Sequence, residues 1–344
     1  MTFRIGILGG GNISYTHARA AREIKGVEIV AVCGQNQEKV ERLAKECGAI
    51  ACRDLESFLT LKPMEVALIG SPSGLHAEHG IRAARNGLHA LVEKPVTITT
   101  EQADALVAEC DEAKVKLGVF FQDRFAPDIL KLKALIDGGA LGKPFLVSAQ
   151  VKWYRPPDYY KGSRWRGTWA LDGGGALMNQ GVHTVDLLLW LMGDVRRVSG
   201  KAITAMHDIE VEDTAVATLE FSNGAIGTLE AATSAFPGYP RRIEVTGSEG
   251  TIILEGDRIT SADLRSPLLE SVGHQATGDD ERSRSHMISD ASGHRRVIED
   301  FLHAIATDGS PLCDGHQARR SVAVIQAIYE SSRTGQSVSL ATNR

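Results

Sequence analysis

The first 120 residues alternate short apolar runs with amphipathic stretches, and this alternation limits the folds open to the chain. Apolar runs at 4–8, 27–33, 66–69 and 89–92 each precede a stretch with helical spacing of apolar residues. Strands alternating with helices of this length predict right-handed β–α–β units, and therefore a parallel sheet with helices on both faces. We expect α/β architecture here.

The pattern changes after Arg124. A helix at 127–136 and a strand at 144–153 precede a loop rich in aromatic and basic residues. An apolar helix ends near Met192, and the alternating runs from 195 to 259 are separated by turn residues. Consecutive strands joined by short turns are typical of an antiparallel sheet.

Two domains account for this order, as the length of 344 residues also suggests. We expect an N-terminal Rossmann dinucleotide-binding domain over 1–122. A C-terminal α+β domain with an open, mainly antiparallel sheet should follow over 123–344. The polar segment 261–293 is expected to be a loop, and two helices should close the chain.

Composition excludes several classes of function. Lys plus Arg number 38 against 43 Asp plus Glu, a net charge of -5 that argues against nucleic acid or an anionic membrane as partner. The longest apolar runs are far shorter than the ~20 residues that span a bilayer. The five scattered cysteines never form a C-x-x-C pair, so we expect neither disulfides nor structural zinc, and a cytoplasmic location.

A glycine-rich turn between the first strand and the first helix predicts a cofactor site. It reads Gly9-x-Gly11-x-x-Ser14, and Asn12 and Ile13 open the helix. Glycines allow a tight turn and close backbone approach to a pyrophosphate, and the helix N-terminus adds partial positive charge. The alternative is a glycine-rich turn that binds no ligand.

The choice of dinucleotide depends on the end of the second strand, where a carboxylate would bind the ribose of NAD. Cys33, Gly34, Gln35 and Asn36 stand there, with neither an acid nor an arginine. These residues do not decide between NAD and NADP as the cofactor. We assign Gly34 to the cofactor site.

Two further segments end parallel strands at the edge where open α/β sheets bind ligands. Ser71-Pro72 follows one strand and leads to His76, and Glu93-Lys94-Pro95 follows the next. We assign Ser71, Pro72, His76, Glu93 and Lys94 to cofactor contacts. Lys94, fixed between an apolar strand and Pro95, is a candidate catalytic residue rather than an ordinary surface lysine.

The apolar helix after Gly173-Gly174-Gly175 carries a polar stripe. Asn179, His183 and Asp186 are spaced i, i+4, i+7 and should share one face. Buried polar groups need hydrogen-bond partners, which a ligand cleft would supply. A core histidine with internal partners is one alternative, and zinc bound by His183 and Asp186 is another, although no third ligand has suitable spacing.

The aromatic and basic loop suits a sugar, because rings stack on C–H faces and guanidinium groups bind hydroxyls. Aromatic side chains are also common in cores, so this interpretation competes with plain packing. The residues that we assign to substrate binding are Arg124, Tyr154, Tyr160, Trp165, Arg166, Asn179 and His183.

Several motifs together resemble the glucose–fructose oxidoreductase / inositol dehydrogenase (Gfo/Idh/MocA) family. They are GGGNIS near the N-terminus, EKP at 93–95 and GGGALMNQGVHTVDLLLWLMG at 173–193, with QDRF at 122–125 and VTGSEGTIIL in agreement. The resemblance covers essentially the whole chain, and the motifs occur in the expected order.

The resemblance implies oxidation or reduction of a sugar, inositol or nucleotide-sugar with NAD or NADP, with NAD slightly favoured. It places the catalytic lysine at Lys94 and the catalytic histidine at His183, with Asn179 where many members carry Asp. The loop also resembles members that act on the 3-hydroxyl of a hexose. A homodimer or homotetramer is expected, formed through the open sheet.

Two alternatives remain open at this point. A non-catalytic dinucleotide-binding regulator on the same fold would be expected to lack Lys94 or His183. A lyase or glycosidase that uses bound NAD transiently would begin with the same hydride step.

Overall fold

The computed structural model describes residues 2–266 and 290–341, and they form two compact units. The first unit contains residues 2–122 together with 290–319. The second contains 123–266 together with 320–341. The chain thus leaves the first unit after Gln122, where the sequence places a domain boundary, and later contributes 290–319 to it again.

The first unit is built on a six-stranded parallel sheet with the strand order β3-β2-β1-β4-β5-β6. This is the doubly wound Rossmann order, whose change of direction falls between β1 and β4. Both faces are covered, and β4 is buried at every position because of this. The elements are β1 (Phe3–Leu8), α1 (Asn12–Arg22), β2 (Val27–Cys33), α2 (Gln37–Cys47), β3 (Ile50–Cys52), α3 (Leu55–Leu59), β4 (Val66–Ile69), α4 (His76–Arg85), β5 (His89–Val92), α5 (Thr100–Glu112) and β6 (Leu117–Val119).

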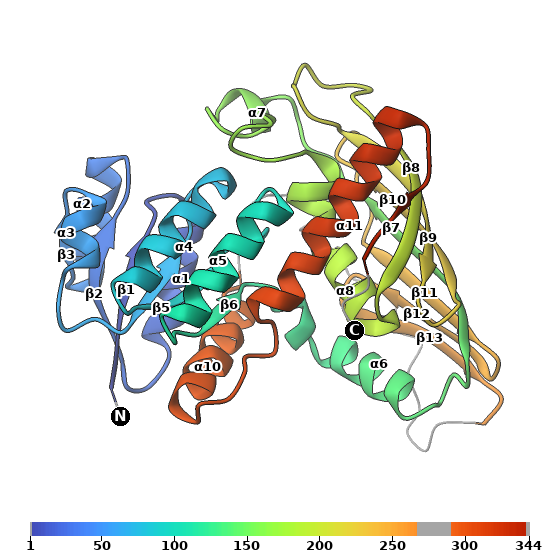
Figure 1. The fold of residues 1–344 in the computed structure, drawn as a ribbon, viewed down its shortest axis with the longest axis horizontal. Helices are drawn as coiled ribbons and strands as arrows, with labels where there is room; N and C mark the ends of the chain where they lie inside the picture. The colour runs from blue at the N-terminus through green and yellow to red at the C-terminus, as the bar shows by residue number, and fades with distance from the viewer. Residues whose placement is uncertain (1, 267–289, 342–344) are drawn as a thin grey trace. The chain divides into compact units, whose positions relative to one another are not determined.

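A helix from far along the chain completes this unit. Helix α10 (Ser292–Ala306) contacts α1, and Figure 1 shows it in orange beside the blue and cyan elements. Its Phe301 is fully buried, and a Cβ on Gly118 of β6 would lie 2.6 Å from the Phe301 ring. The missing side chain at Gly118 therefore makes room for this helix.

The second unit contains an eight-stranded sheet with the order β13-β12-β11-β7-β10-β9-β8-β14. Most neighbours are antiparallel, but β7 and β10 pair in parallel, with Ile226 opposite Leu146. The expectation of a mainly antiparallel sheet is confirmed. The elements are α6 (Pro127–Asp137), β7 (Pro144–Lys152), α7 (Asp158–Lys161), α8 (Val182–Met192), β8 (Val195–Ile203), β9 (Thr214–Phe221), β10 (Ile226–Ala232), β11 (Arg242–Gly247), β12 (Gly250–Glu255), β13 (Arg258–Leu264), α11 (Gly315–Thr334) and β14 (Val338–Ser339).

The two faces of this sheet differ in burial. Val147, Ala149 and Val151 of β7 are buried, and β7 contacts α8. Leu146 and Ile226 are exposed, as side chains alternate along each strand. Among the described residues, these apolar side chains are thus left exposed on the outer face of the sheet.

The loop expected over 261–293 is wrong at both ends. Strand β13 continues to Leu264, which pairs with Gly250 of β12, and α10 begins at Ser292. Backbone pairing with a neighbouring strand outweighs the polar composition of the segment. Residues 267–289 lie outside the described part of the chain, so the rest of this expectation has no structural test.

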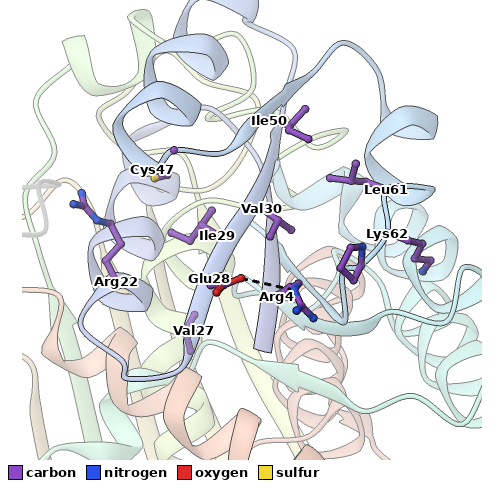
Figure 2. Close-up of a pocket in the computed structure, with 12 residues that line it drawn as sticks. Arg4, Arg22, Val27, Glu28, Ile29, Val30, Cys47, Ile50, Leu61 and Lys62 are labelled. Atoms are coloured by element: carbon purple, nitrogen blue, oxygen red, sulfur yellow. Dashed lines mark ion pairs between the residues drawn. The ribbon is translucent and has the colours of Figure 1, made fainter. Parts of the chain in front are cut away.

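A cavity at the amino ends of β1 and β2 lies away from the edge where parallel sheets bind ligands. Figure 2 shows Arg4, Val27 and Ile50 among its lining residues, with Arg4 3.7 Å from Glu28. Nothing in its lining matches the motifs of the predicted site. Among the described residues, no helix combines the length and apolar character needed to cross a membrane.

Candidate active site

The glycine turn after β1 is closed by contacts that exclude a side chain. Gly9 has a φ of +153°, and its N–H donates to the Cys33 carbonyl at 2.6 Å. A Cβ on Gly9 would lie 2.5 Å from Ser14 Oγ and 2.7 Å from the Gly70 carbonyl oxygen. Only glycine fits here, as the fingerprint predicts.

The N-terminus of α1 is open to a ligand. Gly11 is the N-cap residue, so no side chain caps the helix, and the first turn contains no acid. Gly11 and Asn12 are exposed, Ile13 is half-buried, and a Cβ on Gly11 would meet nothing within 4 Å. The first backbone N–H groups of a helix lack internal partners and favour an anion. The turn therefore fits the pyrophosphate of a dinucleotide.

The end of β2 approaches this turn closely. A Cβ on Gly34 would lie 3.0 Å from the Gly9 carbonyl carbon, so the two turns pack backbone against backbone. Gln35 is exposed, and the side-chain oxygen of Asn36 accepts the Lys39 N–H at 3.0 Å and caps α2. Neither residue brings a charge to the ribose position.

The segments after β4 and β5 are tied together by His76. Its Nε2 lies 2.9 Å from the Ser71 carbonyl oxygen and its Nδ1 lies 2.7 Å from the Pro95 carbonyl oxygen. The ring is buried, and burial lowers its pKa. Ser71 Oγ in turn contacts His79 Nδ1 at 2.8 Å. The contacts of His76 are therefore to the two loops, and a direct cofactor contact stays a prediction.

Lys94 follows β5 directly and is half-buried. Its backbone N–H donates to Glu93 Oε2 at 3.1 Å, and Glu93 is buried against His17. Pro72 is half-buried after β4, on the same edge of the sheet. Residues of the glycine turn, Ser71-Pro72 and Glu93-Lys94 thus share the carboxyl edge of one sheet.

In the second unit, the polar stripe begins in a π-helix rather than an α-helix. Residues Ala176–Gly181 form this π-helix, and it continues into α8. Asn179 lies in the π turn and His183 in the first turn of α8. Single π turns inside helices are frequent at functional sites because they change the direction of a side chain. The sequence predicted one regular α-helix with Asn179 and His183 four residues apart on one face. This prediction is wrong at Asn179, which lies in the π-helix.

Glu212 anchors the start of the π-helix. Its carboxylate accepts the Gly175 N–H at 2.9 Å, the Leu177 N–H at 2.8 Å and the Tyr329 hydroxyl at 2.9 Å. Burial raises the pKa of Glu212 to about 7, and these hydrogen bonds oppose the rise. A Cβ on Gly175 would lie 1.8 Å from the Glu212 carbonyl oxygen. The missing side chain at Gly175 therefore makes room for the Glu212 backbone.

The amide of Asn179 is held by a buried aspartate. Its Nδ2 donates to Asp172 Oδ1 at 2.7 Å, and Asp172 Oδ2 accepts the Gly167 N–H at 2.9 Å. The Asn179 Oδ1 accepts from Gln180 Nε2 at 3.3 Å. These contacts fix which way the half-buried amide points. Sequence reasoning did not single out Asp172, although it directly precedes the three glycines.

His183 lies close to an aspartate that sequence reasoning also missed. Its Nδ1 lies 3.8 Å from Asp123 Oδ2, and the same carboxylate is paired with buried Arg241. This separation is longer than a hydrogen bond, so the carboxylate acts on the ring through its charge, on the Nδ1 side. Asp123 belongs to the QDRF run at 122–125, and this motif was the feature of the sequence that could have identified it.

Arg124 and Asp186 form a buried ion pair. Arg124 Nε and NH2 donate to the two carboxylate oxygens of Asp186 at 2.8 and 2.7 Å, and each side chain is 1% exposed. This pair joins the QDRF segment to α8 and uses the carboxylate that the zinc alternative required. Substrate contact by Arg124 remains untested, but its guanidinium lies inside the unit.

The aromatic loop forms a cationic cluster next to the π-helix. The Arg166 guanidinium lies 4.3 Å from the centre of the Tyr159 ring, and Arg155 lies 5.7 Å from it. Arg155 NH2 also donates to Gln180 Oε1 at 3.3 Å, and Gln180 Nε2 donates to the Tyr159 hydroxyl at 3.1 Å. Gln180 thus connects the cluster to Asn179.

The other predicted substrate residues have varied surroundings. The buried Tyr160 hydroxyl bonds Thr233 Oγ1 at 2.9 Å. Tyr154 packs edge-on against Phe236, and half-buried Trp165 lies 5.4 Å from the Arg166 guanidinium. Tyr160 is therefore part of the core, and Trp165 and Arg166 remain accessible to a ligand.

The comparisons with known proteins agree with this geometry. Residues 3–121 match the model of the oxidoreductase family, NAD-binding Rossmann fold, and residues 129–253 match the GFO/IDH/MocA C-terminal domain. A crystal structure of the WlbA dehydrogenase from Bordetella pertussis, in complex with NADH and UDP-GlcNAcA, is 32% identical, with a TM-score of 0.89 over 99% of this chain and 98% of that one.

Two curated relatives extend the comparison. The myo-inositol 2-dehydrogenase of Thermotoga maritima is 28% identical over 76% of this chain and 78% of its own. The D-xylose 1-dehydrogenase (NADP(+)) 2 of Haloferax volcanii is 27% identical over 97% of this chain and 99% of its own.

The chain belongs to the GFO/IDH/MocA family of oxidoreductases, and its first unit is an NAD-binding Rossmann domain. The resemblance found in its motifs is confirmed. NAD or NADP is accordingly the cofactor, and the glycine turn fits its pyrophosphate.

The raised pKa of Glu212 makes a prediction about stability. The folded chain holds this proton between about pH 4.5 and 7, where the unfolded chain has lost it, so wild-type stability falls as pH rises through that window. Glu212→Gln removes this titration. The difference in free energy of unfolding, variant minus wild type, should therefore be larger at about pH 8 than at about pH 5. We expect it to be larger by about 1–3 kcal/mol.

Urea unfolding at the two pH values measures this difference. Glu249→Gln, at an exposed site of the same unit, is the matched control and should track wild type. Equal pH dependence in wild type and Glu212→Gln would show that Glu212 titrates normally.

The neutral end of β2 makes a second prediction. We expect both dinucleotides to bind, with a preference below about 100-fold, or about 2.7 kcal/mol. Gln35→Asp should move the preference toward NAD by more than about tenfold, because a carboxylate binds the ribose diol and repels a 2′-phosphate. Gln35→Asn is the neutral control, and fluorescence titration of each variant is the measurement. A thousandfold preference in wild type would reveal another residue that reads the 2′ position.

Proposed function

We propose that this chain transfers a hydride between NAD(P) and a secondary alcohol of a nucleotide-linked sugar, at the 3-hydroxyl of the hexose. The chief support is the full-length similarity to the dehydrogenase described with NADH and UDP-GlcNAcA. The cationic cluster of Arg155, Arg166 and Tyr159 also suits an anionic substrate.

Each candidate side chain has a role that its contacts support. His183, close to Asp123, takes the hydroxyl proton on Nε2, because an imidazole can both accept and donate a proton near neutral pH. The ammonium of Lys94 stabilises the developing alkoxide. Asn179, held by Asp172, orients a neighbouring hydroxyl and cannot serve as a base. The bound nicotinamide supplies the hydride acceptor or donor.

The negative charge of a sugar diphosphate or uronate explains the composition of the loop. Arg155 is 2% exposed, and burial lowers its pKa. Its contacts include the Tyr154 carbonyl oxygen, the Gln180 amide and the Trp153 ring. An anion near Arg155 and Arg166 would gain charge-assisted hydrogen bonds. A neutral polyol would gain less from the same residues.

Substitution of Lys94 tests this function. Lys94→Met should abolish turnover and leave dinucleotide affinity within about tenfold, or ~1.4 kcal/mol, because the change removes the ammonium at the reacting hydroxyl and spares the glycine turn. Lys62→Met, in an exposed loop of the same unit, is the matched control. Normal turnover of Lys94→Met would remove Lys94 from the chemistry.

The substrate class is tested by a panel assayed with NAD and with NADP. It contains UDP-GlcNAcA, UDP-GlcNAc, myo-inositol, scyllo-inositol and glucose. Net cofactor reduction with a nucleotide sugar, at a kcat/KM well above that of the inositols, is the expected result. Preference for an inositol would contradict the nucleotide-sugar assignment, and product formation without net reduction would indicate a lyase.

We further propose that the outer face of the eight-stranded sheet is covered by a second copy of the chain. Leu146, Val216 and Ile226 are 42–57% exposed on it, and Leu146 and Ile226 are direct neighbours. Exposed apolar side chains grouped on one face are typical of an interface. We place the enzyme in the cytoplasm, where its five free cysteines would stay reduced.

Sedimentation at micromolar concentration checks the assembly. A species of two or four chains is expected, and Ile226→Glu should shift it toward monomer because it buries a charge in the interface. Ile50→Glu, at an exposed apolar residue of the first unit, is the control. A wild-type monomer would contradict the proposed interface.

A further inference from the structure

A buried polar cluster in the first unit contacts the backbone of Lys94. It consists of His17 from α1, Glu93 from the end of β5 and His294 from α10. All three side chains are buried, and Glu93 is the one that the sequence assigned to a cofactor contact. Buried charged groups are costly, so such a cluster calls for a physical account.

The carboxylate of Glu93 is the centre of the cluster. Glu93 Oε1 lies 2.9 Å from His17 Nε2 and 3.7 Å from His294 Nε2. Its other oxygen, Oε2, accepts the backbone N–H of Lys94 at 3.1 Å. One carboxylate therefore connects two imidazoles, on two different helices, to the backbone of Lys94.

Glu93 is the charged member of the cluster. Burial opposes its ionisation, but hydrogen bonds and charge interactions with His17 and His294 outweigh burial and hold its pKa well below the usual value. Burial lowers the pKa of His17, and the hydrogen bond and the charge of Glu93 oppose this shift. The His17 ring is itself fixed by stacking on Phe120, with centroids 4.4 Å apart.

The next residue along the chain is held from another direction. His76 of α4 contacts the Pro95 carbonyl oxygen at 2.7 Å, while Glu93 holds the Lys94 amide. The backbone on both sides of the Lys94 side chain is thus tied to buried groups. The charged or titratable groups close to Glu93 are His17, His294, His76 and Lys94.

We propose that His17, Glu93 and His294 are positioning residues that fix Lys94 for catalysis. The two imidazoles hold the Glu93 carboxylate, and the carboxylate fixes the Lys94 amide and places a negative charge on the residue that precedes Lys94. A misplacement of about 1 Å can cost about a hundredfold in rate, so this support matters for turnover. The inference rests on the proposed role of Lys94.

The same three residues could bind a metal ion, since their ligand atoms all lie within 4.8 Å of one another. The separation of 2.9 Å between Glu93 Oε1 and His17 Nε2 is that of a direct hydrogen bond. The second carboxylate oxygen is used by the Lys94 amide. These contacts favour the hydrogen-bonded network.

Three variants of the full-length protein test the proposal: Glu93→Gln, His294→Gln and the double variant. Glu93→Gln keeps the volume and an acceptor oxygen but removes the charge. We expect its kcat to fall about a hundredfold, with KM for the dinucleotide within about threefold, and the alkaline limb of its pH–rate profile to move to lower pH. His303→Gln, at an exposed position on α10, is the matched control.

Coupling separates positioning from a merely structural role. If His294 acts through Glu93, then His294→Gln lowers kcat in wild type but has no further effect beyond about twofold in the Glu93→Gln background. Additive losses together with an unchanged pH profile would overturn the proposal. One equivalent of zinc retained by the purified wild type, and lost in His294→Gln, would also overturn it.

Failure of this inference can be told apart from failure of the proposed function. An inactive Lys94→Met variant combined with a fully active Glu93→Gln variant rejects the positioning role alone. An active Lys94→Met variant rejects the function assigned to Lys94. Circular dichroism and NADH binding confirm that each variant is folded.

Discussion

In each of the two units, the candidate site residues depend on one kind of interaction, a backbone N–H that donates to a buried carboxylate. Glu93 holds the amide of Lys94 in the first unit, and Glu212 holds the amides of Gly175 and Leu177 in the second. Each carboxylate is anchored in turn by a donor from a distant helix, His17 or Tyr329. The pKa of Glu93 lies well below its usual value, so its hydrogen bonds are charge-assisted, and such bonds are about twice as strong as neutral ones.

This arrangement explains why the glycines gather where they do. Gly9 and Gly34 allow two turns to meet at the sheet edge, and Gly175 lets the Glu212 carbonyl approach the π-helix. In each case a Cβ would lie 3.0 Å or less from backbone atoms. The backbone is therefore positioned before any ligand arrives, which reduces the ordering cost of binding.

Much of the fold follows from the sequence, because the spacing of apolar residues and the positions of turn residues specify local structure. Strands β2, β4 and β5 begin and end where their apolar runs do. The short elements α3 and β14 have no such signal, and β13 continues into polar sequence because it pairs with β12. The return of α10 to the first unit depends on packing against α1, which no local pattern encodes.

Site residues that belong to a recognisable motif could be predicted from the sequence. Residues that contact them from a distant part of the chain could not. The glycine turn, Lys94 and His183 stand in recognisable runs. Asp123, 60 residues before His183, and Glu212, far beyond Gly175, could be placed only by the structure. The π turn at Asn179 likewise arises from tertiary contacts rather than from helical propensity.

We infer that this enzyme moves a hydride from the carbon that bears the reacting hydroxyl to the nicotinamide. The most direct measurement uses a nucleotide sugar deuterated at C3, with mass spectrometry of the cofactor after turnover. The claim predicts that deuterium accumulates in the reduced cofactor and that turnover slows relative to the unlabelled sugar. Reduced cofactor without deuterium, or product formed while the cofactor remains oxidised, would contradict it.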